Sequence, residues 1–126
     1  MRILLDTHLL LWWLANSPAL PAEGRKLISD PENTVFVSTV SLWEIWLKKS
    51  LGKLRLPADF EKKLEGEAFE SLPLAAEQTR QVALLPWHHR DPFDRMLVAQ
   101  AQVENLTLLT TDAVVSAYGD SVRLVR

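Results

Sequence analysis

The fold of this chain is indicated by residues 3–18, which read ILLDTHLLLWWLANSP. The short apolar run from Ile3 to Leu5 predicts a buried strand that ends at Asp6. A helix is predicted from Thr7 to Ala15, because the polar segment Asn16-Ser17-Pro18 stops it. The chain therefore begins with a strand and a helix that meet at an acidic residue.

Strands and helices alternate along the rest of the chain. Further strands are predicted over residues 34–38, part of 69–74, 106–110 and 122–125. Further helices are predicted over residues 21–29, 42–51, 57–66, 75–85, 92–105 and 113–118. This alternation is typical of a parallel sheet with right-handed crossovers and helices on both faces. We expect an α/β fold in which residues 1–126 form one domain.

The composition is that of a folded protein, because 48% of the 126 residues are hydrophobic and 24% are charged. The net charge of −2 argues against nucleic-acid binding through bulk basicity, although a metal ion can supply positive charge locally. The lack of cysteine excludes disulfides, zinc–thiolate sites and thiol nucleophiles. The first residues do not resemble a secretory signal and no apolar run is long enough to span a bilayer, so we expect a soluble cytoplasmic protein.

Four acidic residues fall where predicted strands end or the following helices begin. Asp6 follows the first strand, and Asp112 follows the strand over 106–110. Glu44 and Asp94 lie in the first turns of two predicted helices. Since ligands of an open parallel sheet gather beyond the carboxyl ends of its strands, we expect the four carboxylates to converge at one edge.

Each of these acids also has a local explanation. Asp6, Asp91 and Asp112 each precede a predicted helix that they are suited to cap, and Ser41 to Glu44 has the form of a capping box. Capping accounts for each acid singly but not for their convergence, since carboxylates that share a site repel one another unless a cation compensates. Oxygen ligands of this kind suit Mg²⁺ or Mn²⁺, which activate water and stabilise the charge that builds on a phosphodiester.

Five segments of the chain match the motifs of one family in order. They are Leu4-Leu5-Asp6-Thr7-His8, Val40-Ser41-Leu42-Trp43-Glu44-Ile45, His88-His89-Arg90-Asp91-Pro92-Phe93-Asp94-Arg95, Leu97-Val98-Ala99-Gln100-Ala101 and Leu109-Thr110-Thr111-Asp112. In these segments the chain resembles the PIN-domain nucleases, most closely the VapC-like toxins of bacterial type II toxin–antitoxin modules. The Asp-Pro-Phe-Asp-Arg block is specific for one branch of that family.

The resemblance implies a three-layer sandwich whose central parallel sheet has about five strands. It also implies an endoribonuclease that depends on Mg²⁺ or Mn²⁺. The catalytic and metal-binding acids that it implies are Asp6, Glu44, Asp94 and Asp112. Thr7 and Thr111 stand where the family places hydroxyls that order the site, and Asp91 either lines the pocket or caps its helix. The number of metal ions stays open, because the last motif has one acid where some PIN domains have two.

Basic side chains lie beside the predicted site. Lys48 and Lys49 follow Glu44 by about one helical turn. Arg90 and Arg95 flank the Asp-Pro-Phe-Asp block. We expect Lys48, Lys49 and Arg90 to bind RNA phosphates, because an acidic pocket alone repels RNA. Arg95 is expected to support the site, with pairing to one of the acids as an alternative. Each of the four equally fits a solvated position on an exposed helix face.

Histidines and tryptophans suggest contacts with partners. His88 and His89 are expected in a loop that contacts RNA or shapes the rim of the site, rather than as metal ligands. The helix over 7–15 is apolar on all sides, and Trp43 and Trp46 lie three residues apart on another helix. This excess predicts a surface covered by another chain, so a homodimer and a cognate antitoxin are the expected partners. Stacking of an exposed tryptophan on an RNA base is a further interpretation.

The predicted function is hydrolysis of RNA phosphodiester bonds by the toxin component of a type II toxin–antitoxin system. The alternative is a PIN-like module that binds RNA or a partner without cutting. Such a module is expected to lack one or more of the acids, and this chain retains all four.

Overall fold

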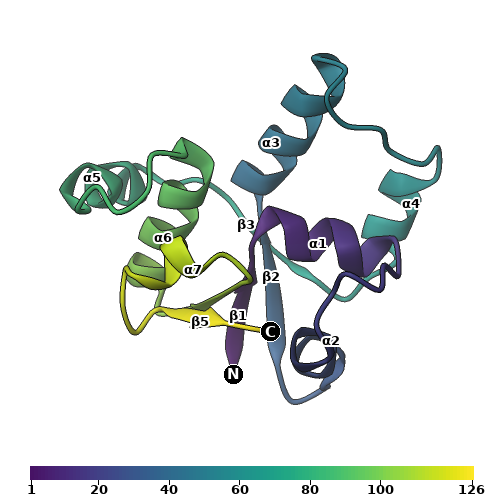
Figure 1. The fold of residues 1–126 in the computed structure, drawn as a ribbon, viewed down its shortest axis with the longest axis horizontal. Helices are drawn as coiled ribbons and strands as arrows, with labels where there is room; N and C mark the ends of the chain where they lie inside the picture. The colour runs from purple at the N-terminus through teal and green to yellow at the C-terminus, as the bar shows by residue number, and fades with distance from the viewer.

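Figure 1 shows the computed structural model, which describes residues 1–126 as five strands and seven helices. The strands are β1 (Arg2–Leu5), β2 (Thr34–Ser38), β3 (Glu70–Leu72), β4 (Thr107–Thr110) and β5 (Val122–Leu124). The helices are α1 (Thr7–Leu14), α2 (Ala22–Ser29), α3 (Thr39–Ser50), α4 (Phe60–Glu65), α5 (Ala76–Leu84), α6 (Pro92–Glu104) and α7 (Ala113–Ser116). Every predicted element is present, with ends shifted by a few residues.

The sheet is parallel throughout and has the order β3-β2-β1-β4-β5. The first strand lies in the middle, where Leu4 is paired with Phe36 of β2 and Leu5 with Leu109 of β4. The chain first winds outward from β1 to β3 and then returns to the other side of β1. Ligands of open α/β sheets bind where the strand order reverses, which here is the carboxyl end of β1 and β4.

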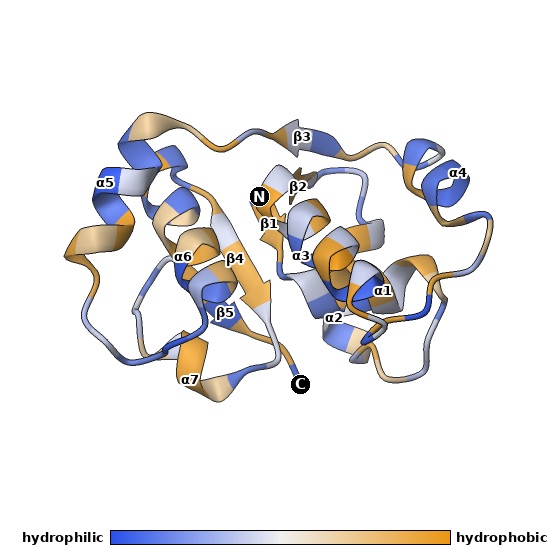
Figure 2. Ribbon diagram, turned by 90° about the horizontal axis from the view of Figure 1, so that it is seen from above, coloured by the Kyte–Doolittle hydropathy of each residue, from blue (hydrophilic) through white to orange (hydrophobic).

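Two apolar clusters, one on each face of the sheet, form the core. On one face, Leu9 of α1, Ile28 of α2, Ile45 of α3 and Phe60 of α4 pack together with strand residues. The other face is covered by α5, α6 and α7, through residues that include Leu85, Leu97, Val98 and Val115. Figures 1 and 2 show these two groups of helices on opposite sides of the strands, so the predicted three-layer α/β sandwich is confirmed.

The central strands are buried on both faces, which explains their unbroken apolar sequence. Ile3 and Leu5 belong to one cluster and Leu4 to the other, and all three are at most 1% exposed. The strands β1 and β4 are accordingly orange in Figure 2. Burial of each such leucine or isoleucine contributes roughly 1.5–3 kcal/mol, so the middle of the sheet is a stable platform for the residues at its edge.

The start of α3 differs from the sequence prediction. The helix begins at Thr39 instead of 42, because Ser38 at the end of β2 accepts a 3.0 Å hydrogen bond from the Val40 N–H and caps it. The predicted capping box from Ser41 to Glu44 is therefore wrong. Glu44 lies in the second turn of α3, where its carboxylate has no capping role.

None of the seven helices is long and apolar enough to cross a membrane.

Candidate metal centre

Asp6 is held rigidly at the carboxyl end of β1. As the N-cap of α1 it accepts a 2.8 Å hydrogen bond from the Leu9 N–H through Oδ1. Its Oδ2 accepts a 2.6 Å hydrogen bond from the Thr110 hydroxyl at the end of β4. Burial raises the pKa of the Asp6 carboxyl above its ordinary value, and the nearby charge of Glu44 raises it further. Asp6 therefore both caps a helix and places a buried carboxylate at the strand-order reversal.

Glu44 presents a second buried carboxylate from α3. Its residue is 3% exposed, and its Oε2 is paired with the ammonium group of Lys48 one turn later. This hydrogen bond raises the pKa of Lys48, so the lysine stays charged. The other oxygen, Oε1, is buried and has no hydrogen-bond partner. A buried carboxylate oxygen without a donor is costly, so Glu44 has capacity for a further positive ligand.

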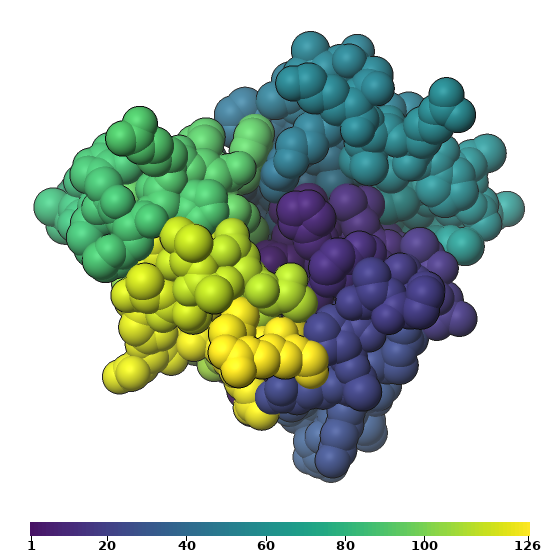
Figure 3. Space-filling view, in the orientation of Figure 1, coloured from purple at the N-terminus to yellow at the C-terminus, as the bar shows by residue number.

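Asp91 and Asp94 come from the start of α6. Asp91 is the N-cap, and its Oδ1 accepts hydrogen bonds from the backbone N–H groups of Phe93 (2.8 Å) and Asp94 (3.0 Å). The pKa of Asp94 is raised to about 7, first by burial and then by the charges of Asp91, Asp6 and Glu44. These acids from three segments of the chain therefore share one electrostatic site. Figure 3 shows the hollowed surface between the helices that carry them.

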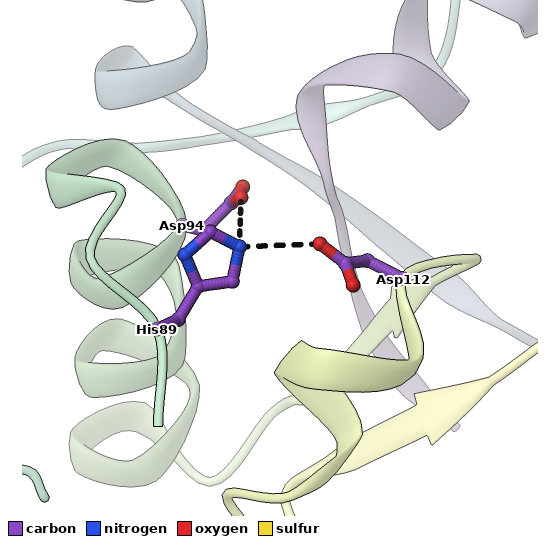
Figure 4. A group of neighbouring side chains, drawn as sticks. All are labelled: His89, Asp94 and Asp112. Atoms are coloured by element: carbon purple, nitrogen blue, oxygen red, sulfur yellow. Dashed lines mark hydrogen bonds and ion pairs between the residues drawn. The ribbon is translucent and has the colours of Figure 1, made fainter. Parts of the chain in front are cut away.

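Asp112 joins the site from the turn after β4. It caps α7 by accepting a 2.9 Å hydrogen bond from the Val114 N–H at Oδ1. Its Oδ2 lies 3.2 Å from Nε2 of His89, and the same nitrogen lies 3.4 Å from Oδ2 of Asp94 (Figure 4). The backbone N–H of Asp112 also donates to the Thr110 hydroxyl, over 3.1 Å. Asp112 is thus connected to Asp94 through a histidine and to Asp6 through a threonine.

This set of residues fits a divalent cation of the Mg²⁺ type. The available ligands are carboxylate oxygens, which Mg²⁺ and Mn²⁺ prefer over nitrogen or sulfur. One of these oxygens, Glu44 Oε1, is buried without a donor, and one carboxyl, Asp94, has its pKa raised to about 7 by burial and by its acidic neighbours. A bound cation would give Oε1 of Glu44 a partner and would reduce the repulsion around Asp94.

The two threonines that were predicted to support the site, Thr7 and Thr111, make different contacts. Thr7 is buried on α1, and its hydroxyl donates a 3.1 Å hydrogen bond to the Ser41 hydroxyl on α3. Thr7 therefore links the two helices that carry Asp6 and Glu44. The hydrogen bonds to Asp6 and Asp112 come from Thr110 and not from Thr111, whose side chain makes no hydrogen bond in this structure.

Arg95 lies on the side of α6 away from the carboxylates. Its guanidinium donates to the backbone carbonyls of Val82 (3.1 Å), Leu85 (3.4 Å) and Pro86 (2.9 Å) and stacks on Trp87. Arg95 does not pair with an acid, so the alternative in which it pairs with one of the acids of the site is wrong. Arg95 instead fastens the end of α5 and the following loop to α6.

The three predicted RNA-binding residues also differ in placement. Lys48 is in the site, paired with Glu44. Lys49 points along α3, where its ammonium lies 5.5 Å from the centre of the Trp46 ring. Arg90 is exposed in the loop before α6 and makes no hydrogen bond or ion pair. Only Lys48 is in contact with a carboxylate of the site.

Two residues of the site were not predicted in these roles: Thr110 as a hydrogen-bond donor to Asp6, and His89 as a bridge between acids. Thr110 could have been found from strand register, because Leu5 is paired with Leu109 and the next residues, Asp6 and Thr110, are therefore neighbours. No comparable signal exists for His89, whose position depends on the path of a loop.

A cavity of about 550 Å³ opens beside Glu44, between α1, α3 and the segment leading to α4. Its apolar lining includes Leu11, Trp12, Leu54 and Phe60, and its basic lining consists of Lys48, Lys53, Arg55 and Lys63. The cavity thus combines an apolar floor with positive side chains, directly next to the acidic site.

The fold and the site together define an α/β domain with a cluster of carboxylates at the strand-order reversal. The chain belongs to the PIN-domain family of nucleases, whose model matches residues 3–120. The resemblance seen in the sequence is thereby confirmed. No curated protein matches the chain in sequence.

Solved structures of toxin–antitoxin systems share this fold. VapBC2 from Rickettsia felis, bound to a DNA fragment from its promoter, is 18% identical with a TM-score of 0.70, over 98% of this chain and 97% of that chain. FitAcB from Neisseria gonorrhoeae is 20% identical with a TM-score of 0.68, over 95% of both chains. VapBC-5 from Mycobacterium tuberculosis is 22% identical with a TM-score of 0.63, over 99% of this chain and 98% of that chain.

Proposed function

We propose that this protein is a Mg²⁺- or Mn²⁺-dependent endoribonuclease and the toxin component of a type II toxin–antitoxin system. The observation that carries the proposal is the convergence of acidic side chains from separate segments at the strand-order reversal, where Oε1 of Glu44 is buried without a hydrogen-bond partner. Partial burial, and then the charges of Asp91, Asp6 and Glu44, raise the pKa of Asp94 to about 7, in agreement with this convergence. Repulsion between carboxylates destabilises the metal-free protein, and a cation bound at the strand-order reversal would remove this repulsion. RNA as the substrate, and the cytoplasm as the location, follow from the resemblance to VapC-like toxins.

The acids have distinct roles in this proposal. Asp6, Glu44 and Asp94 hold the metal, which when bound lowers the pKa of water and stabilises the negative charge on the phosphodiester. Asp6 is fixed by its two hydrogen bonds, so it positions its ligand oxygen without reorganisation. Asp112 is more exposed than Asp6 and has both oxygens occupied, by Val114 and His89, which suits the orientation of a water molecule.

Lys48 has one role in the metal-free site and another in the proposed metal-bound site. In this structure it neutralises Glu44. A cation bound at Glu44 would compete for its carboxylate and leave the Lys48 ammonium available to the RNA backbone, where it would offset the repulsion between phosphate and carboxylates. Lys49 and Arg90, which are exposed on either side of the site, extend this positive surface.

The direct test compares RNA cleavage by the wild type and Asp94→Asn with Mg²⁺, Mn²⁺ or EDTA. The proposal expects cleavage by the wild type with either metal, none in EDTA, and a loss of at least about 100-fold in the variant. Asp120→Asn, a change of an exposed acid remote from the site, is the matched control and should cleave normally. Equal cleavage by the Asp94 variant, or cleavage that survives EDTA, overturns the proposal.

The cavity beside Glu44 supports an antitoxin as a partner. Its apolar floor suits the hydrophobic face of a peptide, and its four basic side chains suit acidic residues on that peptide. Occupation of this cavity would also cover the acidic site. Co-purification with the product of a small adjacent gene tests the assignment, and Trp12→Asp should abolish it while Trp87→Asp, at an exposed tryptophan elsewhere, should not.

Exposed apolar side chains along α3 support a homodimer. Trp43, Leu47 and Leu51 are 60%, 37% and 59% exposed and recur at a spacing that places them along one side of the helix. A second copy would cover them. Light scattering should report a dimer for the wild type and a monomer for Leu47→Glu/Leu51→Glu, whereas Leu84→Glu, at a more exposed leucine on α5, should remain dimeric. A monomeric wild type contradicts the assignment.

A further inference from the structure

His89 makes hydrogen bonds through both nitrogens of its ring, and together they determine where its proton lies. Nδ1 accepts a 2.9 Å hydrogen bond from the backbone N–H of Asp91, so it carries no proton. In the neutral ring the single proton is therefore on Nε2. That nitrogen faces Oδ2 of Asp112 at 3.2 Å and Oδ2 of Asp94 at 3.4 Å (Figure 4). His89 thus donates a hydrogen bond to Asp112 and lies within ion-pair distance of Asp94, and its Nε2 has no lone pair for a metal.

The backbone of His89 is also fixed. Its N–H donates a 3.1 Å hydrogen bond to the Tyr118 hydroxyl, which in turn donates to the Pro86 carbonyl over 2.8 Å. Arg95 donates to the same hydroxyl over 3.0 Å. The loop is therefore attached to α6 and to Tyr118, two residues after α7, so the ring is held between the acids by contacts that do not involve them.

His89 is the only side chain that joins Asp94 to Asp112. The contact with Nε2 of His89 is the one close polar contact of the Asp94 carboxylate, and the remaining oxygen of Asp112 is engaged by the Val114 N–H. Asp94 is meanwhile repelled by Asp91, Asp6 and Glu44. Without the donor between them, repulsion favours rotation of the Asp94 carboxylate away from the cluster.

We propose that His89 is a positioning residue: through Nε2–H it orients Asp94 and Asp112 for the metal, and it is not itself a ligand. The inference rests on the proposed function. Donors that orient metal ligands from behind typically contribute 10- to 100-fold to metal affinity. Loss of the donor should therefore weaken metal binding by about that factor.

The test measures Mn²⁺ affinity by electron paramagnetic resonance for the whole protein and two variants of equal side-chain length. His89→Gln keeps an N–H donor at the reach of Nε2, whereas His89→Met has none, and both lose the acceptor for the Asp91 N–H equally. We expect His89→Met to bind Mn²⁺ about 10- to 100-fold more weakly than the wild type, and His89→Gln to recover a large part of that loss. His88→Met, whose ring packs on Tyr118 and touches no acid, should bind as the wild type does.

The possible results separate this inference from the proposed function. Equal Mn²⁺ affinity in His89→Met and the wild type, with normal RNA cleavage in both, overturns only the role of His89. A pulsed resonance signal from a nitrogen bound directly to Mn²⁺, present in the wild type and absent in both His89 variants, overturns it as well, because His89 would then be a ligand. A wild type that binds no Mn²⁺ overturns the proposed function and this inference together. Melting in EDTA verifies that the variants are folded.

Discussion

The hydroxyl of Thr110 donates a 2.6 Å hydrogen bond to the buried carboxylate of Asp6. It thereby connects the ends of two adjacent strands at the point where the strand order reverses. The same hydroxyl accepts the N–H of Asp112. One threonine therefore connects the first acid of the site to the last, and it does so without a charge of its own.

Removal of this hydroxyl should affect both stability and metal binding. In Thr110→Val the buried Asp6 carboxylate loses a donor, which costs about 1–3 kcal/mol and should lower the melting temperature by roughly 5 °C. Mn²⁺ should bind more weakly, because Asp6 is no longer held in place. Thr111→Val, one residue later and free of such contacts, is the matched control. Calorimetry and Mn²⁺ titration distinguish them, and equal behaviour of the two variants would contradict the role of Thr110.

The pKa of Asp94 predicts how the stability of the metal-free protein varies with pH. The folded chain holds this proton up to about pH 7, while the unfolded chain releases it near its ordinary value of 3.8. The stabilisation is therefore complete below pH 3.8 and is lost as pH rises through 7. We expect the wild type in EDTA to become less stable between pH 4 and pH 8.

The variant Asp94→Asn should remove this dependence. It should be more stable than the wild type at pH 8 in EDTA, by about 2 kcal/mol, and similar to it at pH 4. Mg²⁺ should restore the wild type at pH 8 and leave the variant unchanged. Urea unfolding at the two pH values measures both effects. If the free energy of unfolding varied with pH in the same way in the wild type and the variant, the raised pKa would not belong to Asp94.

The ion pair between Lys48 and Glu44 predicts competition with metal. Lys48→Gln removes a positive charge that occupies Glu44, so Mn²⁺ affinity should rise by roughly tenfold, which is about 1.4 kcal/mol. The metal-free protein should become less stable, since Glu44 is left buried without a counter-charge. The KM for RNA should increase, because the phosphate backbone loses a cation. Lys49→Gln, whose charge lies over Trp46, should change Mn²⁺ affinity little, and a weaker rather than tighter Mn²⁺ site in Lys48→Gln would refute the competition.

The buried guanidinium of Arg95 predicts a structural role. Arg95→Met leaves the carbonyls of Val82, Leu85 and Pro86 without their donor, which should cost about 3 kcal/mol in the free energy of unfolding. Arg80→Met, at an exposed position on α5, is the control and should be neutral. Urea midpoints measure the difference. Unchanged stability with a loss of RNA affinity would instead assign Arg95 to the RNA surface.

The sequence carries nearly all of the information about the fold. Apolar runs such as Ile3–Leu5 identify strands that are buried on both faces, and the regular alternation with helices leaves a parallel sheet as the natural arrangement. The prediction failed at the start of α3, because two serines, Ser38 and Ser41, are both competent caps. Only the direct passage from β2 into the helix selects Ser38.

The carboxylates of the site were predictable, whereas their connections were not. Asp6 and Asp94 follow from strand ends and helix starts, which local patterns identify. The choice between Thr110 and Thr111 depends on which side of a strand faces Asp6, and this requires the register of two strands about 100 residues apart. The roles of His89 and Arg95 depend on a loop whose path is determined by hydrogen bonds to Tyr118, and no local pattern encodes it.

The central position of β1 has a consequence for the synthesis of the protein. Of the five strands, β1 is made first and lies in the middle of the sheet, whereas its second neighbour, β4, is the fourth to be made. Asp6 therefore gains its contacts with Thr110 and Asp112 only after β4 has been made, and a chain that ends before β4 lacks part of the site. The complete carboxylate cluster is therefore a property of the assembled sheet and not of its first strand and helix alone.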